Sequence, residues 1–522
     1  MTAKTRYDYL SSERTQFLDE AEEGAELTLP YLITKDQYSK GMRHLPTPWQ
    51  SVGAKCAVTL AAKLMQSMLP VQTSFFKLQV DESQLGQEFG PQIKSELDLS
   101  FAKIERTILD AIAASNDRVV VHEALLHLVV AGNALIFMGK EGLKVYPLNR
   151  YVVERDGDGN VIEIITKETI AKKLIEDQLP EDLLKQYDTV VDGSDDNVEE
   201  CDIYTHIKRD NNRYVWHQEV HGKILEKSYG KAPVDISPWI PLRFNTVDGE
   251  DYGRGRVGQF IGDLKSLEAL SQALVEGSAA AAKVVFTVSP SSTTKPSTLA
   301  NAGNGAIVQG RPDDIGVVQV GKTADFRTAF EMMQQLERRI NEAFLVMQVR
   351  QSERTTAEEV RLTQMELEQQ LGGLFSLLTT EFLLPYLNRI LNQFQKTGKI
   401  PRLPKDIVKP TIVAGVNALG RGQDRESLGQ FLTVISQTMG PEAVQKFINP
   451  EEVIKRLAAS QGIDVLNLVK SMEEIQGKEQ QAQQMAMQQQ QTENQTAMMK
   501  TPMMDPSKNP AIAGQTQPPT EE

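Results

Sequence analysis

Two long helical patterns, on either side of a segment rich in Ser, Thr, Pro and Gly, constrain the fold of this chain most strongly. In Val257–Lys283 and in Phe326–Met347, apolar residues recur at the spacing of one helical face. The first pattern ends in small residues, which allow helices to pack closely. Ser289–Asp314, between the two, has the composition of a loop. The two apolar stripes consist of Val257, Phe260, Ile261, Leu264, Leu267, Leu270 and Leu274, and of Phe330, Met333, Ile340, Phe344 and Met347.

A polar loop with two arginines follows the second of these helices. Thr356 and Glu359 have the spacing of a capping box, in which the threonine accepts a hydrogen bond from the N3 amide and the glutamate reaches back. This spacing predicts that a new helix starts just after Thr356. It leaves Gln348–Thr355 as a loop whose cations are Arg350 and Arg354. No catalytic partner stands near these arginines in the sequence.

The remaining segments predict an α+β chain that is mainly helical. Alternating apolar residues around Asp-Gly turns predict one β-hairpin at Tyr151–Thr166, and a second, turning near Asn211–Asn212, at Asp202–Val220. A Gln/Met-rich and then Pro-rich tail follows Gly477, and its second half has the composition of disordered segments. Other predicted elements are helices at Arg6–Leu27, Thr47–Pro70, Ser95–Ser115 and Arg118–Met138 (its end a strand), a helix toward Thr397 with kinks expected at Gly372–Gly373 and Pro385, an extended segment at Pro401–Gly415, and shorter helices after about Gly420.

Composition and charge narrow the class of protein. The chain has 522 residues, enough for several domains, and a net charge of −14. An acidic chain should not adhere to nucleic acid over its whole surface, because phosphate contacts need clustered Lys and Arg, although it could guide DNA at a few places. Cys56 and Cys201 match no metal spacing and are expected to be thiols in a reducing compartment. The N-terminal segment has no apolar signal core, and the longest apolar run, Leu125–Gly139, is too short to span a bilayer. We therefore expect a cytoplasmic protein, whether a cell's own or made there by a virus, without a membrane partner.

A calcium-binding loop is suggested by Asp156, Asp158 and Asn160, which occupy loop positions 1, 3 and 5. Position 6 should be Gly and is Val161, and position 12 should be Glu and is Lys167. Without the turn glycine and the bidentate carboxylate, the shell around the cation cannot close. The segment therefore predicts a hairpin turn.

Histidine and glycine spacings give no zinc or nucleotide site either. His122 and His127 are five residues apart, whereas a zinc pair on one helical face needs positions i and i+4. His217 and His221 have that spacing, but they lie in a strand pattern with no third ligand nearby. The glycines of Tyr252–Phe260 lack the order of a dinucleotide or phosphate loop. With no nucleophile–base pair or paired carboxylates, we expect no metal, no cofactor, no catalytic residue and no enzymatic activity.

Five segments, in the same order along the chain, carry a resemblance to a known family. The chain resembles the head-to-tail connector, or portal, proteins of short-tailed bacteriophages from about residue 6 to about residue 475. No single motif is decisive, whereas the ordered set is highly specific. The segments are Thr47–Leu78, Glu123–Phe137, Tyr252–Leu274, Thr356–Leu378 and Asn417–Asp424.

The resemblance implies a ring of twelve subunits at one capsid vertex, through whose channel DNA enters during packaging and later leaves. The implied partners are further copies of the chain, the terminase large subunit that drives packaging, major capsid and scaffold proteins, tail adaptor proteins, internal core proteins and double-stranded DNA. The implied location is the virion, at the head–tail junction, after assembly in the host cytoplasm. The implied regions are a wing (1–255), a stem helix (256–284), a clip (285–325), a second stem helix (326–347), a tunnel loop (348–355), a wing/tunnel helix with a return segment (356–420), a crown (421–475) and a partly disordered tail (476–522).

Within this resemblance, Arg350 and Arg354 would face the bore and form circles of guanidinium groups that touch DNA phosphates transiently. A salt bridge between subunits, to Glu353 or Glu358, is the alternative and remains open at this point. The acidity of the chain fits a bore along which DNA slides. Two other functions are alternatives to that of a portal protein. One is an internal scaffold or core protein of the virion, which would be helical nearly throughout. The other is a virion-associated nuclease or peptidoglycan hydrolase.

Overall fold

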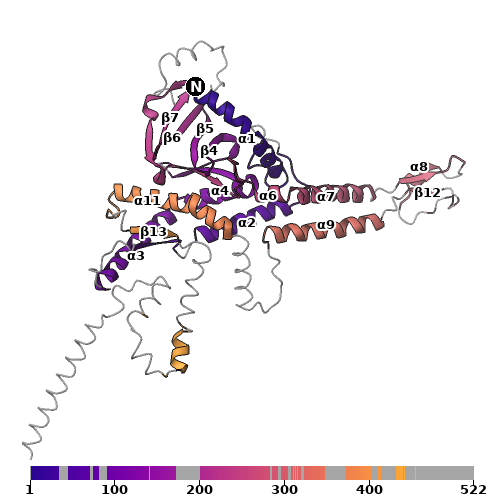
Figure 1. Ribbon diagram of the computed structural model, residues 1–522. Coiled ribbons are helices and arrows are strands. Elements are labelled where there is room, and N and C mark those ends of the chain that lie inside the picture. Colours follow the sequence, from indigo (N-terminus) through magenta and orange to yellow (C-terminus); the bar gives the residue numbers. More distant parts are fainter. Residues whose placement is uncertain are drawn as a thin grey trace, which may run out of the picture. The chain divides into compact units, whose positions relative to one another are not determined.

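The computed structural model describes most of the chain before residue 413 (Figure 1). By its internal contacts the chain forms two units, Met1–Ala418 and Leu419–Glu522, and every element named below belongs to the first. The described residues are 2–34, 45–70, 74–80, 91–139, 142–171, 200–281, 285–291, 295–303, 315–318, 323–346, 372–402 and 408–412, with parts of 307–313 and 429–453.

Four helices make up the N-terminal part, and each lies where the sequence predicts one. The first begins at a Thr2 N-cap, whose side-chain oxygen accepts a hydrogen bond from the Thr5 amide at 3.3 Å. The fourth ends at Gly132, and the chain turns directly into a strand, so the predicted change from helix to strand is confirmed. The helices are α1 (Ala3–Glu26), α2 (Val52–Met68), α3 (Pro91–Ala114) and α4 (Asp117–Ala131).

The β region contains two antiparallel sheets. In one, the order is β10-β2-β3, and in the other it is β4-β5-β6-β7-β8, with β9 also paired to β7. Both predicted hairpins are confirmed, and Asn211 takes a positive φ of 50° in the turn of the second. The strands are β2 (Asn133–Met138), β3 (Leu143–Tyr146), β4 (Tyr151–Arg155), β5 (Val161–Ala171), β6 (Glu200–Asp210), β7 (Arg213–Val220), β8 (Lys223–Ile224), β9 (Gly230–Pro233) and β10 (Trp239–Arg243).

In the C-terminal half of this unit, one strand and one helix pack against the N-terminal part. Strand β13 (Val408–Ile412) pairs antiparallel with β1 (Phe76–Val80), which confirms the extended segment predicted there. The helix ending near residue 397 contains a π-turn at Thr379–Leu383. This turn lies just before Pro385, one of the positions at which the sequence predicts a kink. Gly372–Gly373 are helical. The other elements are α6 (Arg256–Gln259), α7 (Ile261–Ala281), β11 (Val285–Val288), α8 (Pro296–Ala300), β12 (Ile315–Val318), α9 (Thr323–Ala343) and α11 (Leu384–Lys396).

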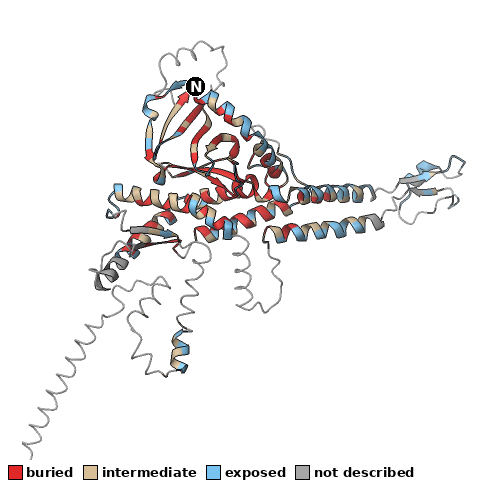
Figure 2. Ribbon diagram, viewed as in Figure 1, coloured by how far each residue is buried: buried red, intermediate tan, exposed pale blue. Residues whose placement is uncertain are grey.

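Helix α4 lies at the centre of the main core and is buried on nearly all sides, as Figure 2 shows. It contacts α2, α1 and β2, and the core continues into the apolar residues of α11. A smaller cluster fixes α1 on the larger sheet, where Tyr7 and Leu10 pack against Val152, Ile165 and Tyr204. The fold therefore depends on a helix whose second half, from Ala124 to Ala131, is buried at every residue.

His127 is the exception to this apolar character, because it is 3% exposed and its Nδ1 atom has no hydrogen-bond partner among the described residues. Burial lowers its pKa to about 4. His122, on the same helix, is only half-buried. The two histidines of this helix therefore lie in different environments.

We predict that His127→Leu removes part of the acid sensitivity of folding. The unfolded chain binds a proton on this histidine below its ordinary pKa of about 6.5, while the folded chain stays neutral down to about pH 4, so stability falls as the pH decreases through this window. The loss between pH 7 and pH 4.5 should be about 2–3 kcal/mol smaller in the variant. Denaturant titrations at both pH values measure it. His221→Asn, at an exposed histidine, should leave the pH dependence unchanged, and an equal slope in parent and His127→Leu would refute the prediction.

Candidate functional site

Helices α7 and α9 run antiparallel and in contact along their lengths. Three contacts define the register: Gly277 lies against Phe326, Ser271 against Met333, and Asp263 pairs with Arg339. A Cβ atom on Gly277 would lie 2.6 Å from the Phe326 ring, so glycine permits the close approach there. Gly277, one of the small residues at the end of the first helical pattern, therefore serves helix packing.

Burial along this helix pair changes from one end to the other. Leu264, Leu267, Ile340 and Phe344 are buried at the end near the main core. Farther along, apolar side chains face solvent, and Figure 2 shows exposed residues along both helices. Phe330, expected on the same stripe as Ile340, is 48% exposed, because none of the elements that the structure describes covers that part of α9. Exposed apolar residues grouped on one element are typical of a contact surface for another protein.

The segment that joins the two helices contains more regular structure than its composition indicates. Strands β11 and β12 form an antiparallel pair, and α8 lies between them in the sequence. Figure 1 shows α8 and β12 beyond the ends of α7 and α9. Ile307, in the same segment, is fully exposed. The segment is thus a small projecting hairpin, a form suited to contacts with other molecules.

Helix α9 ends in a Schellman motif. Leu345 has a positive φ of 59°, its amide donates to the Glu342 carbonyl at 3.0 Å, and the Val346 amide donates to the Asn341 carbonyl at 2.8 Å. Glycine is the usual residue at this position, so a leucine there requires support from its surroundings. Leu345 packs against the main core, which supplies that support.

Two cations from other helices hold the last carbonyls of α9. The Arg256 guanidinium donates to the Ala343 carbonyl at 2.7 and 3.2 Å, and the Lys63 ammonium donates to the Leu345 carbonyl. Burial lowers the pKa of both groups. Positive charge at a helix C-terminus is favourable, because the free carbonyls there carry partial negative charge. The structure therefore fixes the point at which the chain enters residues 347–371.

The predicted loop Gln348–Thr355, with Arg350 and Arg354, lies outside the described residues, as does the predicted capping box of Thr356 and Glu359. The structure describes the residues that anchor the chain immediately before this loop, Arg256 and Lys63, which sequence reasoning missed. The sequence contains only a weak signal for this anchoring role. Arg256 lies in the glycine-rich Tyr252–Phe260 segment, and nothing in the sequence links that segment to the end of α9.

That glycine-rich segment packs against the turn between α4 and β2. The Asn133 side chain donates to the Gly253 carbonyl at 2.7 Å and accepts from the Gly253 amide at 2.7 Å. Cβ atoms on Gly253 and Gly255 would lie 2.7 Å from the carbonyl oxygens of Gly132 and Val130. These glycines therefore permit a close approach of two backbone segments.

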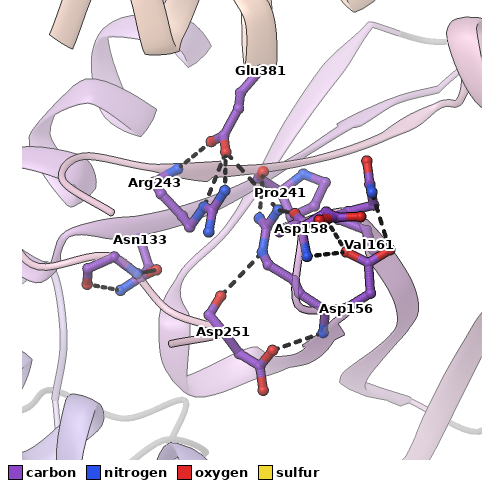
Figure 3. Close-up of polar contacts among 12 residues, drawn as sticks. Asn133, Asp156, Asp158, Val161, Pro241, Arg243, Asp251 and Glu381 are labelled. Atoms are coloured by element: carbon purple, nitrogen blue, oxygen red, sulfur yellow. Dashed lines mark hydrogen bonds and ion pairs between the residues drawn. The ribbon is translucent and has the colours of Figure 1, made fainter. Parts of the chain in front are cut away.

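A buried ion network lies beside this contact. Glu381, in the π-turn, accepts hydrogen bonds from the Arg243 guanidinium at 2.7 and 3.0 Å and from the Arg243 backbone amide at 3.0 Å. Figure 3 shows the Glu381 carboxylate pointing toward Arg243. Arg155 lies 3.9 Å from Glu381 and donates to the carbonyls of Asp251, Pro241 and Gly159. Burial lowers the pKa of Arg155, and the charge of Glu381 partly offsets this. The network joins β4, β10 and the helix before α11.

Neither this network nor the hairpin turn beside it has the features of a catalytic or calcium site. Asp156 accepts hydrogen bonds from the amides of Asp158 and Asn160 at 3.1 and 2.7 Å, so its carboxylate closes the turn. A hydrogen bond from the Asn160 side chain lowers its pKa. A groove of about 800 Å³ beside α1 contains Glu20 and Arg254, which pair with each other at 2.8 Å. Within the described ranges, the charged groups of these sites are therefore occupied by structural contacts.

Comparison with known proteins matches residues 1–467 to the family described as bacteriophage head to tail connecting protein. The chain belongs to this family. It is 37% identical over 488 residues to the portal protein of Escherichia phage T7, covering 91% of this chain and 89% of the relative. The portal protein of Enterobacteria phage SP6 is 30% identical over 486 residues, covering 91% of this chain and 92% of the relative. The resemblance stated from the five sequence segments is thus confirmed.

Solved structures similar to this connector chain have low sequence identity. A chain from the virion of a native gene transfer agent particle is 12% identical with a TM-score of 0.37, over 79% of this chain and 90% of that chain. A chain from the neck of the native particle is 13% identical with a TM-score of 0.37, with the same coverage. Among the helices of the connector that the structure describes, none is long and apolar enough to cross a membrane.

We predict that Glu381→Gln destabilises the connector by about 3 kcal/mol, because removal of one partner leaves two buried guanidinium groups without their counter-charge. The free energy of unfolding in denaturant measures this loss. Glu331→Gln is the matched control. Its ion pair with Arg327 is largely exposed, so that substitution should have almost no effect. Equal effects of the two substitutions would show that the buried network does not stabilise the fold.

Proposed function

We propose that this protein forms the DNA channel at one vertex of a phage capsid, as a ring of identical subunits, and serves genome packaging, retention and ejection and tail attachment. One observation carries the proposal. The chain aligns along nearly its whole length, and along nearly the whole length of the relatives, with portal proteins of short-tailed phages.

The exposed apolar residues of α7 and α9 support a ring. A closed ring of identical subunits uses a heterologous interface, in which two different faces of the same chain meet. Val275 on α7 and Phe330 and Met332 on α9 are 52%, 48% and 52% exposed among the residues that the structure describes. A neighbouring subunit would remove this apolar surface from water, which is favourable by about 25 cal/mol per Å².

The regional assignment proposed from the resemblance fits these elements. The wing (1–255) would contain both antiparallel sheets, the stem would contain α7 and α9, and the clip (285–325) would contain the projecting hairpin. The anchored end of α9 would then present residues 348–355 as the tunnel loop. Residues 356–420, 421–475 and 476–522 remain proposed as the wing/tunnel helix with its return segment, the crown and the tail.

The proposed partners follow from the same assignment. The hairpin with β11, α8 and β12 is the proposed contact for the terminase large subunit and for tail adaptor proteins, because it projects beyond the helix pair. Major capsid and scaffold proteins, internal core proteins and double-stranded DNA complete the set, and twelve is the proposed subunit number. The net charge of −14 per chain would disfavour tight binding to phosphates inside the channel, so the DNA could move.

We predict that the purified full chain forms rings with an open bore, visible in electron-microscopic class averages. The double substitution Val275→Asp and Phe330→Asp should shift the protein to monomers on size-exclusion chromatography, because two carboxylates per subunit would then be buried without partners. The matched control, Val275→Ile with Phe330→Leu at the same positions, keeps the surface apolar and should keep the rings.

The possible outcomes separate the competing functions. Rings in the parent but also in the Asp variant would refute the proposed helix interface and leave the portal function standing. No rings in the parent would contradict the portal function and favour an internal scaffold or core protein. Cleavage of DNA by purified rings in the presence of magnesium would instead support a nuclease.

For the tunnel loop we predict that Arg350→Ala with Arg354→Ala leaves ring formation intact but lowers DNA packaging or retention. Guanidinium groups suit phosphate oxygens, and a circle of weak contacts can steady DNA without fixing it. Measurement of packaged DNA per particle and of DNA leakage tests this role. Fewer or less heat-stable rings in the absence of DNA would point to a salt bridge between subunits, to Glu353 or Glu358. Normal assembly, packaging and retention would refute both roles.

A further inference from the structure

Two histidines and a glutamate meet on one face of the larger sheet. His206 on β6 and His217 on β7 are directly opposite each other in the antiparallel pairing, and Glu219 lies two residues farther along β7, on the same face. One ligand atom from each of the three side chains lies within 4.8 Å of the other two. The His217 Nε2 atom is 3.0 Å from the Glu219 Oε1 atom.

The spacing of histidines along the sequence does not reveal this group, because it pairs His217 with His221. His217 and His221 are close in sequence. However, β7 ends at Val220, and His221 lies in the turn that follows, with a positive φ of 47°. The true neighbour, His206, is eleven residues earlier on the adjacent strand. Only the register of the β6–β7 hairpin brings the two imidazoles together, with ring centroids 5.3 Å apart.

The surroundings of the group are polar and partly shielded from water. The side chains of His206, His217 and Glu219 are 16%, 21% and 8% exposed. The free carboxylate oxygen of Glu219 accepts from the Ala3 amide at 2.6 Å, so the start of α1 already orients this side chain. On the other flank, the ring of His217 packs against Tyr229. The orientation of a ligand by a second hydrogen bond is a common feature of metal sites.

Glu163 is the charged group that contacts His206 beside this cluster. Its carboxylate contacts the His206 Nε2 atom and also accepts from Arg6, which pairs with Glu154 as well. With Arg6 to hold it, Glu163 can release His206 without becoming an unpaired buried charge, and it then adds negative charge beside the site.

We propose that His206, His217 and Glu219 bind a divalent transition-metal ion of the zinc class. Two imidazole nitrogens and one carboxylate oxygen are a ligand set that Zn²⁺ favours, with a fourth position open to water. Tetrahedral bonds of about 2.0–2.1 Å place ligand atoms roughly 3.4 Å apart, so small side-chain rotations suffice to close this group. The ion would join β6 to β7 and, through Glu219, to the start of α1. This site is independent of the function proposed above.

Titration of the metal-free full chain with ZnCl₂ tests the site, with isothermal calorimetry for affinity and thermal unfolding for stability. The parent should bind one Zn²⁺ per chain and unfold at a higher temperature when the ion is present. His206→Gln and His217→Gln should each weaken this binding by about 100-fold and abolish the zinc-dependent rise, since each removes a direct ligand. Substitution with Co²⁺ should give the visible absorption band of a tetrahedral site in the parent and not in either variant.

His221→Asn is the matched control, because it removes a nearby exposed histidine that does not belong to the group, and it should bind zinc like the parent. If either His→Gln variant fails to fold, Glu219→Gln provides the same test, since the glutamine oxygen still accepts from the Ala3 amide. Folding is checked by circular dichroism without zinc. A parent that does not bind one Zn²⁺ per chain, or ligand variants that bind it as tightly as the parent, would overturn the proposal.

Discussion

The structure depends on a contact between two pieces of backbone. At the end of α4, Gly132 and Asn133 meet Gly253 and Gly255 so closely that a Cβ atom at any of the three glycines would clash. The Asn133 side chain adds two reciprocal hydrogen bonds to the Gly253 backbone. Because α6 and α7 start immediately after this contact, it determines where the long helix pair leaves the apolar core.

Buried and half-buried charges fix the other junctions between elements of this unit. Glu381 holds Arg243 and approaches Arg155, which links the strands to the helix before α11. Arg256 and Lys63 hold the carbonyl end of α9. Buried charges cost desolvation energy and therefore tolerate few alternative arrangements. Junctions of this kind suit a subunit whose helices must keep a fixed direction, and they place the start of residues 347–371 relative to the core.

Helices α7 and α9 bury their apolar residues at one end and expose them at the other. Near the core, their apolar residues are buried within the chain, whereas farther out Val275, Phe330 and Met332 face solvent. Apolar side chains grouped on an extended element lower the free energy only when another surface covers them. The relation to portal proteins of phages T7 and SP6, over about nine-tenths of each chain, makes further copies of the same subunit the proposed cover.

The sequence by itself determined the helices of the described residues before the loop at Gln348–Thr355, the two hairpins and the family. These rest on local signals: apolar periodicity, Asp-Gly turns and ordered motifs. Only the tertiary structure decided which distant residues meet. It paired His217 with His206 rather than His221, joined Asn133 to Gly253 across 120 positions, and brought Glu381 to Arg243 across 138. Strand register and helix packing set such contacts, and neither is encoded in the spacing of residues along one segment.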